Sequence, residues 1–238
     1  MKQFSIKKIL ILVTILAVPG FLYYLLQSQG KNRYKPLAYY GPKTVASTFH
    51  TVRGEEIPDT IYHEIKKFDA FLNQKGNQVG WGNYKGKILI FGLFYTNSGD
   101  KYSVQAANKS MQMLKSAYAK NDLIQFVSMT INPRYDTPKV LDIYADSLSA
   151  TPDKWNLLTA DSAKQYQFIN EELLLDAHQG YTDTGIARYA YANYFILVDP
   201  QHRIRGFYEA YNQETISKLD DEIKVLIAEV LRNTKDGR

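Results

Sequence analysis

The segment Gly86–Ser103, GKILIFGLFYTNSGDKYS, contains the strongest fold signal in the chain. Its residues 87–95 form a nearly continuous apolar run of strand length, which is the pattern of a strand buried on both faces of a sheet. Residues 96–100 then interrupt the run with small and polar side chains. Because a strand buried on both faces needs covering layers above and below it, this segment predicts an α/β fold.

Further strands and helices alternate along the chain after this first strand. A helix is predicted over residues 103–120, because apolar side chains recur there three and four positions apart. The other predicted elements are a buried strand at 123–131, a helix opening at 136–138, a short strand at 155–159, a helix over 161–175, a hairpin of 194–199 with 203–208, and a helix over 213–232. This order predicts a thioredoxin-like domain, with a mixed sheet flanked by helices, parallel strands at its centre and an antiparallel C-terminal hairpin.

The N-terminal region is apolar over residues 9–26, ILILVTILAVPGFLYYLL, and has no charged residue between Lys8 and Lys31. At about 1.5 Å per residue, this run nearly crosses a hydrocarbon core of about 30 Å. It predicts an N-terminal transmembrane helix. A cleaved signal peptide is the alternative, but the run exceeds the usual length of a signal core, and no Ala-x-Ala cleavage pattern follows it.

The predicted organisation follows from this anchor. It consists of a cytoplasmic N-terminus at 1–8, a transmembrane anchor at 9–30, a tether containing an early strand or hairpin at 31–60, and the thioredoxin-like domain at 61–238.

The charge of the chain is unevenly distributed. Residues 1–54 contain eight basic residues and no acidic one, whereas the remaining 21 basic residues are outnumbered by 24 acidic ones. A nucleic-acid reader would carry its positive charge on the folded domain, so the pattern argues against nucleic acid as a partner. Basic residues flank the apolar run on both sides, so the positive-inside rule is nearly balanced. The short N-terminus is expected to stay in the cytoplasm, with the large C-terminal domain exported to the periplasmic side of the membrane.

Three stretches of the chain resemble the SCO1/SenC family of membrane-anchored, thioredoxin-fold copper proteins. They are Gly86–Ser103, quoted above, DTPKVLDIYADSLSATPDKWNLLTAD at Asp136–Asp161, and YFILVDPQHRIRGFYEA at Tyr194–Ala210. The resemblance covers about residues 35–235, in the order that the family has. It implies a cell-envelope protein linked to maturation of the copper centre of cytochrome oxidase, and the lead-in favours a bacterial inner membrane.

The resemblance also locates the family's copper ligands. In that family the loop after the first core strand carries Cys-x-x-x-Cys, and a histidine precedes the C-terminal hairpin. Matching the segments places Ser98 and Tyr102 at the two cysteine positions and Tyr191 at the histidine position, with Tyr189 on the same side. This chain has no cysteine at all.

The absence of cysteine determines which chemistry we predict for this site. Thiolates hold Cu(I) because they are soft donors, whereas a serine hydroxyl is neutral and a tyrosine phenol with a pKa near 10 is a poor, hard donor. Thiol–disulfide chemistry needs a thiolate and is therefore excluded. We predict that the chain has no bound metal, no cofactor and no catalytic residue.

Three functional hypotheses follow. The favoured one is a membrane-tethered accessory protein, not an enzyme, that binds a protein partner such as a respiratory oxidase subunit or a copper-loaded SCO relative. The alternative is a remodelled pocket, formed by Asp100, Tyr102, Tyr191 and His178, that binds a small ligand or performs non-thiol chemistry. In a third, a partner subunit supplies copper ligands.

Two features bear on the choice between these hypotheses. Asp100 has a simpler interpretation, as the N-cap of the helix that follows it. The many tyrosines near the predicted site either form a recognition surface or fill the space that a copper site would leave.

Overall fold

The computed structural model describes residues 6–29, 36–52, 54–185 and 187–235. The chain divides into two compact units, residues 1–35 and 36–238, which are described separately.

The first unit contains helix α1 (Ile6–Gln29), which has Pro19 in its interior. Most of its described apolar side chains, such as Leu16, are exposed. Among the described residues, no helix is both long enough and apolar enough to cross a membrane. Most of the predicted cytoplasmic N-terminus lies outside the described residues, as does the start of the predicted tether at 31–35.

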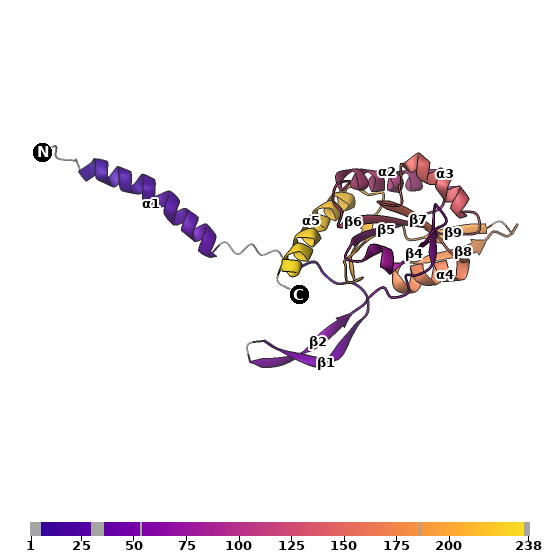
Figure 1. Cartoon of the computed structure of the whole chain (residues 1–238), viewed down its shortest axis with the longest axis horizontal. Helices are drawn as coiled ribbons and strands as arrows, with labels where there is room; N and C mark the ends of the chain where they lie inside the picture. The colour runs from indigo at the N-terminus through magenta and orange to yellow at the C-terminus, as the bar shows by residue number, and fades with distance from the viewer. Residues whose placement is uncertain (1–5, 30–35, 53, 186, 236–238) are drawn as a thin grey trace. The chain divides into compact units, whose positions relative to one another are not determined.

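The second unit is built on a mixed sheet (Figure 1). Within the described residues this sheet has seven strands, in the order β11-β10-β5-β6-β7-β3-β4. These strands are β3 (Phe71–Asn73), β4 (Gln78–Val79), β5 (Ile88–Phe94), β6 (Ile124–Thr130), β7 (Trp155–Thr159), β10 (Tyr194–Val198) and β11 (Ile204–Glu209). Strands β5, β6 and β7 are parallel, and the others pair antiparallel. The predicted parallel centre and C-terminal hairpin are therefore confirmed.

Strand β5 divides the interior into two layers because its side chains alternate between the faces of the sheet. Ile88, Ile90 and Phe94 belong to one apolar cluster, whereas Leu89 and Phe91 belong to the other. Both faces of the strand are thus buried, which explains why its sequence is apolar throughout.

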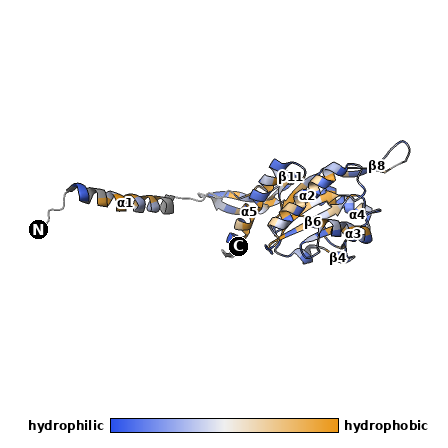
Figure 2. Ribbon diagram, turned by 90° about the horizontal axis from the view of Figure 1, so that it is seen from above, coloured by the Kyte–Doolittle hydropathy of each residue, from blue (hydrophilic) through white to orange (hydrophobic). Residues whose placement is uncertain are grey.

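Helices cover both faces of the sheet, and their apolar sides face it (Figure 2). One cluster includes side chains of α2 (Lys101–Ala117), α3 (Pro138–Leu148) and α5 (Gln213–Lys235). The opposite cluster includes side chains of η1 (Trp81–Tyr84), α4 (Ser162–Gln167) and η2 (Phe168–Glu172). The helix predicted over 161–175 is therefore two short segments.

Two further pairs of strands form separate two-stranded ribbons. The first pairs β1 (Lys43–Val52) with β2 (Glu55–Tyr62), and extends away from the sheet (Figure 1). The second pairs β8 (Ala177–Tyr181) with β9 (Ala187–Tyr191). The early hairpin expected in the lead-in is present, whereas none of the strands predicted from the sequence covers the β8–β9 ribbon.

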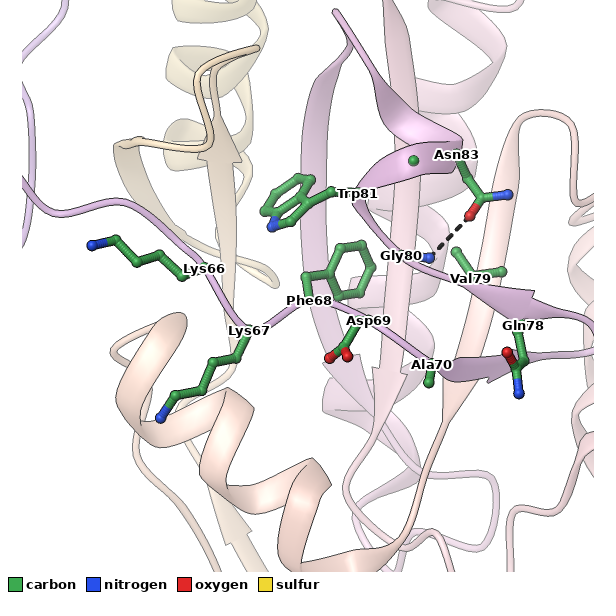
Figure 3. A pocket seen from close by; sticks show the side chains of 11 residues that line it. Lys66, Lys67, Phe68, Asp69, Ala70, Gln78, Val79, Gly80, Trp81 and Asn83 are labelled. Carbon is green, nitrogen blue, oxygen red and sulfur yellow. Dashed lines mark hydrogen bonds between the residues drawn. The ribbon is translucent and has the colours of Figure 1, made fainter.

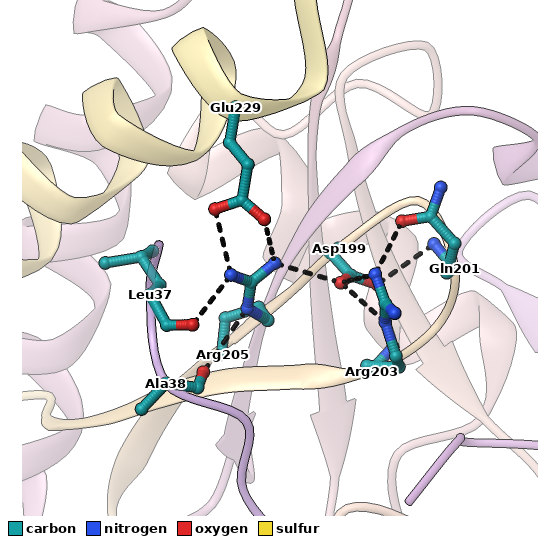
Figure 4. A network of polar contacts seen from close by, with 7 residues as sticks. All are labelled: Leu37, Ala38, Asp199, Gln201, Arg203, Arg205 and Glu229. Atoms are coloured by element: carbon teal, nitrogen blue, oxygen red, sulfur yellow. Dashed lines mark hydrogen bonds and ion pairs between the residues drawn. The ribbon is translucent and has the colours of Figure 1, made fainter. Parts of the chain in front are cut away.

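A buried polar centre fastens the beginning of the second unit to its end (Figure 4). Arg205 on β11, which is 1% exposed, donates two hydrogen bonds to Glu229 of α5 at 3.0 and 2.9 Å and one to Asp199 at 3.1 Å. It also donates to the carbonyl oxygens of Leu37 and Ala38 at 2.8 and 3.3 Å. A fully paired guanidinium therefore joins the lead-in, the C-terminal hairpin and the last helix.

Candidate functional site

The candidate site lies at the carboxyl ends of the parallel strands β5 and β6, whose last residues, Phe94 and Thr130, are aligned. The loop at 95–100 leads from β5 into α2, and the loop at 131–137 leads from β6 into α3. In open α/β sheets, ligand sites usually lie beyond the carboxyl ends of the parallel strands.

A buried carboxylate organises the floor of the site. Asp136, which is fully buried, accepts hydrogen bonds from the hydroxyls of Thr96 and Thr130, and from the Thr96 amide at 3.2 Å. Burial raises the pKa of Asp136 above its usual range, although these hydrogen bonds oppose the shift. The sequence indicated only that a helix opens at 136–138, and in the structure Thr137 takes the N-cap position of α3.

Ser98, at the first cysteine position, is bound by its own loop. It is 6% exposed, and its Oγ accepts a hydrogen bond from the Asp100 amide at 3.1 Å. The same hydroxyl donates to the Asp100 carbonyl oxygen at 3.2 Å. The side chain therefore stabilises a tight turn, and both hydrogen-bonding roles of its oxygen are occupied.

Asp100 caps the helix that follows. Its carboxylate accepts a hydrogen bond from the Ser103 amide at 3.1 Å, which is the geometry of an N-cap. Hydrogen bonds from Ser103 lower the pKa of Asp100. Tyr102, at the second cysteine position, lies in the first turn of α2 and is 82% exposed.

Tyr191, at the histidine position, packs into the site. Its ring lies edge-on to the ring of Tyr95, with centroids 6.2 Å apart, and Tyr95 also packs against Tyr189 at 5.4 Å. Burial, followed by the neighbouring Tyr95 and Asp100, raises the pKa of Tyr191 well above its usual value. The phenol is therefore neutral at physiological pH.

His178 lies on the opposite face of the β8–β9 ribbon from Tyr191. In this ribbon Ala177 pairs with Tyr191 and His178 pairs with Ala190. Because successive side chains of a strand point to opposite faces, His178 and Tyr191 point away from each other. His178 is exposed, and its nearest ionic partner is Asp176, at 3.5 Å.

The remodelled pocket predicted from the sequence is therefore not assembled. Asp100 turns back to its helix, Tyr102 points into solvent, and His178 lies on the outer face of its ribbon. Only Tyr191 of the four faces the site. Sequence reasoning failed here because the strand register that fixes the direction of His178 is not visible in a polar segment.

The donor set does not fit copper. Ser98 is held by its loop and Tyr191 is a neutral phenol, so neither is a suitable Cu(I) ligand. The thioether sulfurs of Met111 and Met129 are buried in the core, and Met113, which is 47% exposed, lines a concavity between α2 and α5 that includes neither Ser98 nor Tyr191. Among the described residues, no group of three or more His, Cys, Asp or Glu side chains gathers in a metal-binding arrangement.

Six tyrosines lie on the loops, the first turn of α2 and the β8–β9 ribbon of this region, and we call them the tyrosine surface: Tyr95, Tyr102, Tyr135, Tyr181, Tyr189 and Tyr191. Register places Tyr181, Tyr189 and Tyr191 on one face of the β8–β9 ribbon. Tyr181 and Tyr135 are 63% and 52% exposed. Tyr189 Oη donates to Asn132 Oδ1 at 2.8 Å, which fixes the ribbon against the β6–α3 loop.

The fold and the site define a thioredoxin-like domain whose loop after β5 presents hydroxyl groups and no thiol. The SCO1/SenC family model matches residues 60–228, which is more than half of the chain. The protein therefore belongs to the SCO1/SenC family, and the resemblance found in the sequence is confirmed.

Individual relatives agree with this assignment. A SCO1 protein homolog of Bacillus subtilis is 23% identical over 173 residues, which cover 72% of this chain and 86% of that protein. The crystal structure of a SCO1/SenC family lipoprotein from Bacillus anthracis has a TM-score of 0.58 at 22% identity, and the match covers 69% of this chain and 95% of that one. ScoI of Bradyrhizobium japonicum with copper bound has a TM-score of 0.52 at 20% identity, with coverage of 65% and 96%. At these identities the solved structures establish the fold.

Proposed function

We propose that this protein is a SCO-family accessory factor of the cell envelope that has lost copper binding and acts by docking a protein partner. The observation that carries the proposal is that the Ser98 hydroxyl is hydrogen-bonded within its own loop. Where the family pattern has a metal-ligating cysteine, this hydroxyl is buried and completes a turn in its own loop.

The tyrosine surface supports a docking role. Tyr102, Tyr135 and Tyr181 are each more than half exposed around the rim, whereas Tyr95, Tyr189 and Tyr191 pack together behind them. Tyrosine is enriched at protein interfaces, because it adds a large apolar area and a polar tip at little cost in conformational entropy. A rim of exposed rings on a rigid base fits a protein partner better than a small ligand.

The family assignment supports a partner that takes part in oxidase assembly. One solved relative is described as a member of the Sco family of cytochrome c oxidase assembly proteins, and another has copper bound. The proposed partner is accordingly either an oxidase subunit that receives copper or a copper-loaded SCO relative. Neither partner requires this chain to carry the metal or to act as an enzyme.

Membrane tethering is part of the same proposal. The apolar run at residues 9–26 and its flanking basic residues support a single N-terminal span. A structural neighbour is named a lipoprotein, and is thus also held at a membrane. The domain would then work on the periplasmic side of a bacterial inner membrane.

A binding experiment with matched tyrosine variants tests the docking role. The full chain, immobilised in detergent, is titrated with a purified copper-receiving oxidase subunit and with a SCO relative that retains Cys-x-x-x-Cys. The combined variant Tyr102→Ser/Tyr135→Ser/Tyr181→Ser should weaken binding by at least tenfold. Tyr211→Ser is the control, since Tyr211 is also more than half exposed, at 53%, but lies between β11 and α5.

Two results would contradict the docking role. One is that neither partner binds the full chain below about 100 μM, which corresponds to only about 5.5 kcal/mol of binding free energy. The other is that the triple variant and Tyr211→Ser weaken binding equally.

A further inference from the structure

Two neighbouring segments of the candidate site each contain one acidic and one basic residue. In the segment at 95–101 these are Asp100 and Lys101, and in the β6–α3 loop they are Asp136 and Arg134. The fold uses both acidic residues, because Asp100 caps α2 and the buried Asp136 accepts hydrogen bonds from two threonine hydroxyls. The two basic residues are therefore left without an acidic partner in their own segments.

Both of these basic side chains are exposed. Neither Lys101 nor Arg134 makes a hydrogen bond or an ion pair within the part of the chain that the structure describes. A lysine ammonium has only donors, and a guanidinium keeps its charge at every physiological pH. Both side chains are therefore free to pair with an anionic group from outside the chain.

Lys101 lies where the family pattern has its copper loop. It directly precedes Tyr102 of the tyrosine surface. Together with Thr96 and Ser98 it lines a concavity of about 440 Å³ between α2 and α3. A partner that docks on Tyr102 and on the loop of Ser98 would therefore also cover Lys101.

Arg134 directly precedes Tyr135 in a turn that other residues hold in place. The Tyr135 amide donates to the Asn132 carbonyl oxygen at 3.1 Å, and the Tyr189 phenol donates to Asn132 Oδ1 at 2.8 Å. Burial raises the pKa of Tyr189, and the positive charge of Arg134 opposes this rise, so the guanidinium lies near that phenol. Because the turn is already ordered, a partner that binds it loses little conformational entropy there.

The β8–β9 ribbon contributes rings to this surface, but its charges lie elsewhere. Arg188 is exposed and adjacent to Tyr189, but successive side chains of a strand point to opposite faces. Arg188 therefore lies on the other face of the ribbon. Asp183 lies in the turn between the two strands. The basic groups beside the tyrosine rings are thus the two of the loops.

We propose that the tyrosine surface docks an acidic partner surface, whose carboxylates pair with Lys101 and Arg134 around the tyrosine rings. This inference rests on the docking role proposed above. Covering a charge without supplying a counter-charge costs free energy, so a partner that buries these two cations has to provide anionic groups. A carboxylate suits Arg134 in particular, because a guanidinium can donate two parallel hydrogen bonds to it. Tyrosine and arginine are also enriched among the residues that contribute most to binding at protein interfaces.

Lys66 and Lys67 provide a matched control, because they are two exposed cations elsewhere on the domain (Figure 3). They line a concavity of about 710 Å³ formed by residues 66–70 and 78–83, all of which are outside the tyrosine surface. The variant Lys66→Gln/Lys67→Gln therefore removes as much charge as Lys101→Gln/Arg134→Gln does, but leaves the proposed docking area unchanged.

Association kinetics test the inference, with the full chain immobilised in an uncharged detergent and the oxidase subunit and the SCO relative as analytes. At about 50 mM salt, Lys101→Gln/Arg134→Gln should lower the association rate constant about fivefold or more, because it removes the attraction to the partner's carboxylates. At about 300 mM salt the reduction should shrink to about twofold or less, because salt screens exposed charges. Lys66→Gln/Lys67→Gln should stay within about twofold of the wild type at both salt concentrations, and both variants should keep its melting temperature.

Cross-linking with a carbodiimide determines the sign of the partner's charge. This reagent condenses a lysine amine with a carboxylate that contacts it, forming an amide, and the carbodiimide takes up the water that is released. Mass spectrometry of the cross-linked complex should identify Lys101 joined to an aspartate or glutamate of the partner. If the cross-links at this edge join only carboxylates of this chain, such as Asp100, to lysines of the partner, the inference is overturned.

The kinetic outcomes separate this inference from the docking role. If a partner binds the wild type and both double variants at equal rates, the acidic character of the partner surface is overturned, whereas the docking role stands. The same conclusion follows if the two double variants lower the association rate equally. If neither partner binds the wild type, the docking role and this inference are overturned together.

Discussion

Two polar centres of this domain differ in how they use their side chains. Arg205 is buried, and its partners come from residues 37–38, from Asp199 and from Glu229, so it connects distant parts of the chain. Ser98 is also buried, but its hydrogen bonds reach only two residues along its own loop. The first centre stabilises the whole unit, whereas the second stabilises one turn.

This difference shows that folding restricts the choice of residue more strongly at position 205 than at position 98. Replacing Arg205 would leave the partly buried Glu229 carboxylate without its counter-charge and the buried Asp199 with Arg203 alone, so folding constrains the identity of this residue. The Ser98 position makes no such demand, since a small polar residue completes the turn. A family member can therefore lose its metal ligands there while its scaffold remains intact.

The largest effect on stability is expected at the first centre. Arg205→Met should lower the free energy of unfolding by about 3 kcal/mol, because it leaves the partly buried Glu229 without a counter-charge and the buried Asp199 with Arg203 alone. Urea titration of the full chain measures the loss. Arg203→Met is the control: this side chain is partly exposed and pairs only with Asp199, so it should cost clearly less. Equal losses of stability from the two variants would mean that Arg205 contributes no more than a partly exposed arginine, which would contradict its role in connecting distant segments.

A loss of stability between those at Arg205 and Ser98 is expected at Asp136, because its hydrogen bonds join the ends of β5 and β6 to the start of α3. Asp136→Ala should cost about 2–3 kcal/mol, as hydroxyl donors on Thr96 and Thr130 lose a buried partner. Asp136→Asn should cost less, since an amide oxygen still accepts from these donors. Thermal and urea unfolding of both variants provide the comparison.

The pH dependence at Asp136 has a definite sign. Its pKa is raised on folding, so the folded state favours the protonated form more than the unfolded state does. The stabilisation that comes from this raised pKa is therefore fully present below the ordinary value of 3.8, and it is lost as pH rises through the higher pKa of the folded state. Relative to Asp136→Asn, the wild type should lose stability as pH rises from 3.8. A parallel pH profile for the two proteins would contradict this assignment.

A smaller effect is expected at Ser98. Ser98→Ala removes two hydrogen bonds within one loop and should cost about 1 kcal/mol. The loss should be far below that of Arg205→Met in the same urea titration. A comparable loss would mean that Ser98 supports more than its own turn.

The smallest effect on stability is expected at Tyr102, which is 82% exposed. Tyr102→Ser should change the free energy of unfolding by no more than about 0.5 kcal/mol, since exposed positions without special contacts are tolerant. The same substitution should weaken partner binding if the tyrosine surface is the docking site. A stability loss above 1 kcal/mol would reveal a structural role instead.

Much of the fold could be predicted from the sequence, because its signals are local. The apolar runs of β5 and β10 mark strands that are buried on both faces, and the apolar stripe of α5 gives its helical period. The β8–β9 ribbon could not be predicted in this way. Its residues are mostly partly buried or exposed, so no alternation of apolar and polar residues signals a strand.

The candidate site was only partly predictable, for a related reason. The family motif located Ser98, Tyr102 and Tyr191, but not the directions in which they point. The partners of Asp136 and Arg205 depend on contacts between distant segments, which no local pattern contains. The part of the tyrosine surface that lies on the β8–β9 ribbon likewise could not be predicted, because it depends on the register of two strands that the sequence did not indicate.

The central claim is that this SCO-family domain does not hold copper, and a Cu(I) titration of the full chain tests it most directly. The protein is purified under reducing conditions and titrated in competition with a chromogenic Cu(I) chelator, and its metal content is measured. The account predicts no bound copper above background. One equivalent of Cu(I) or Cu(II) bound with sub-micromolar affinity would contradict it.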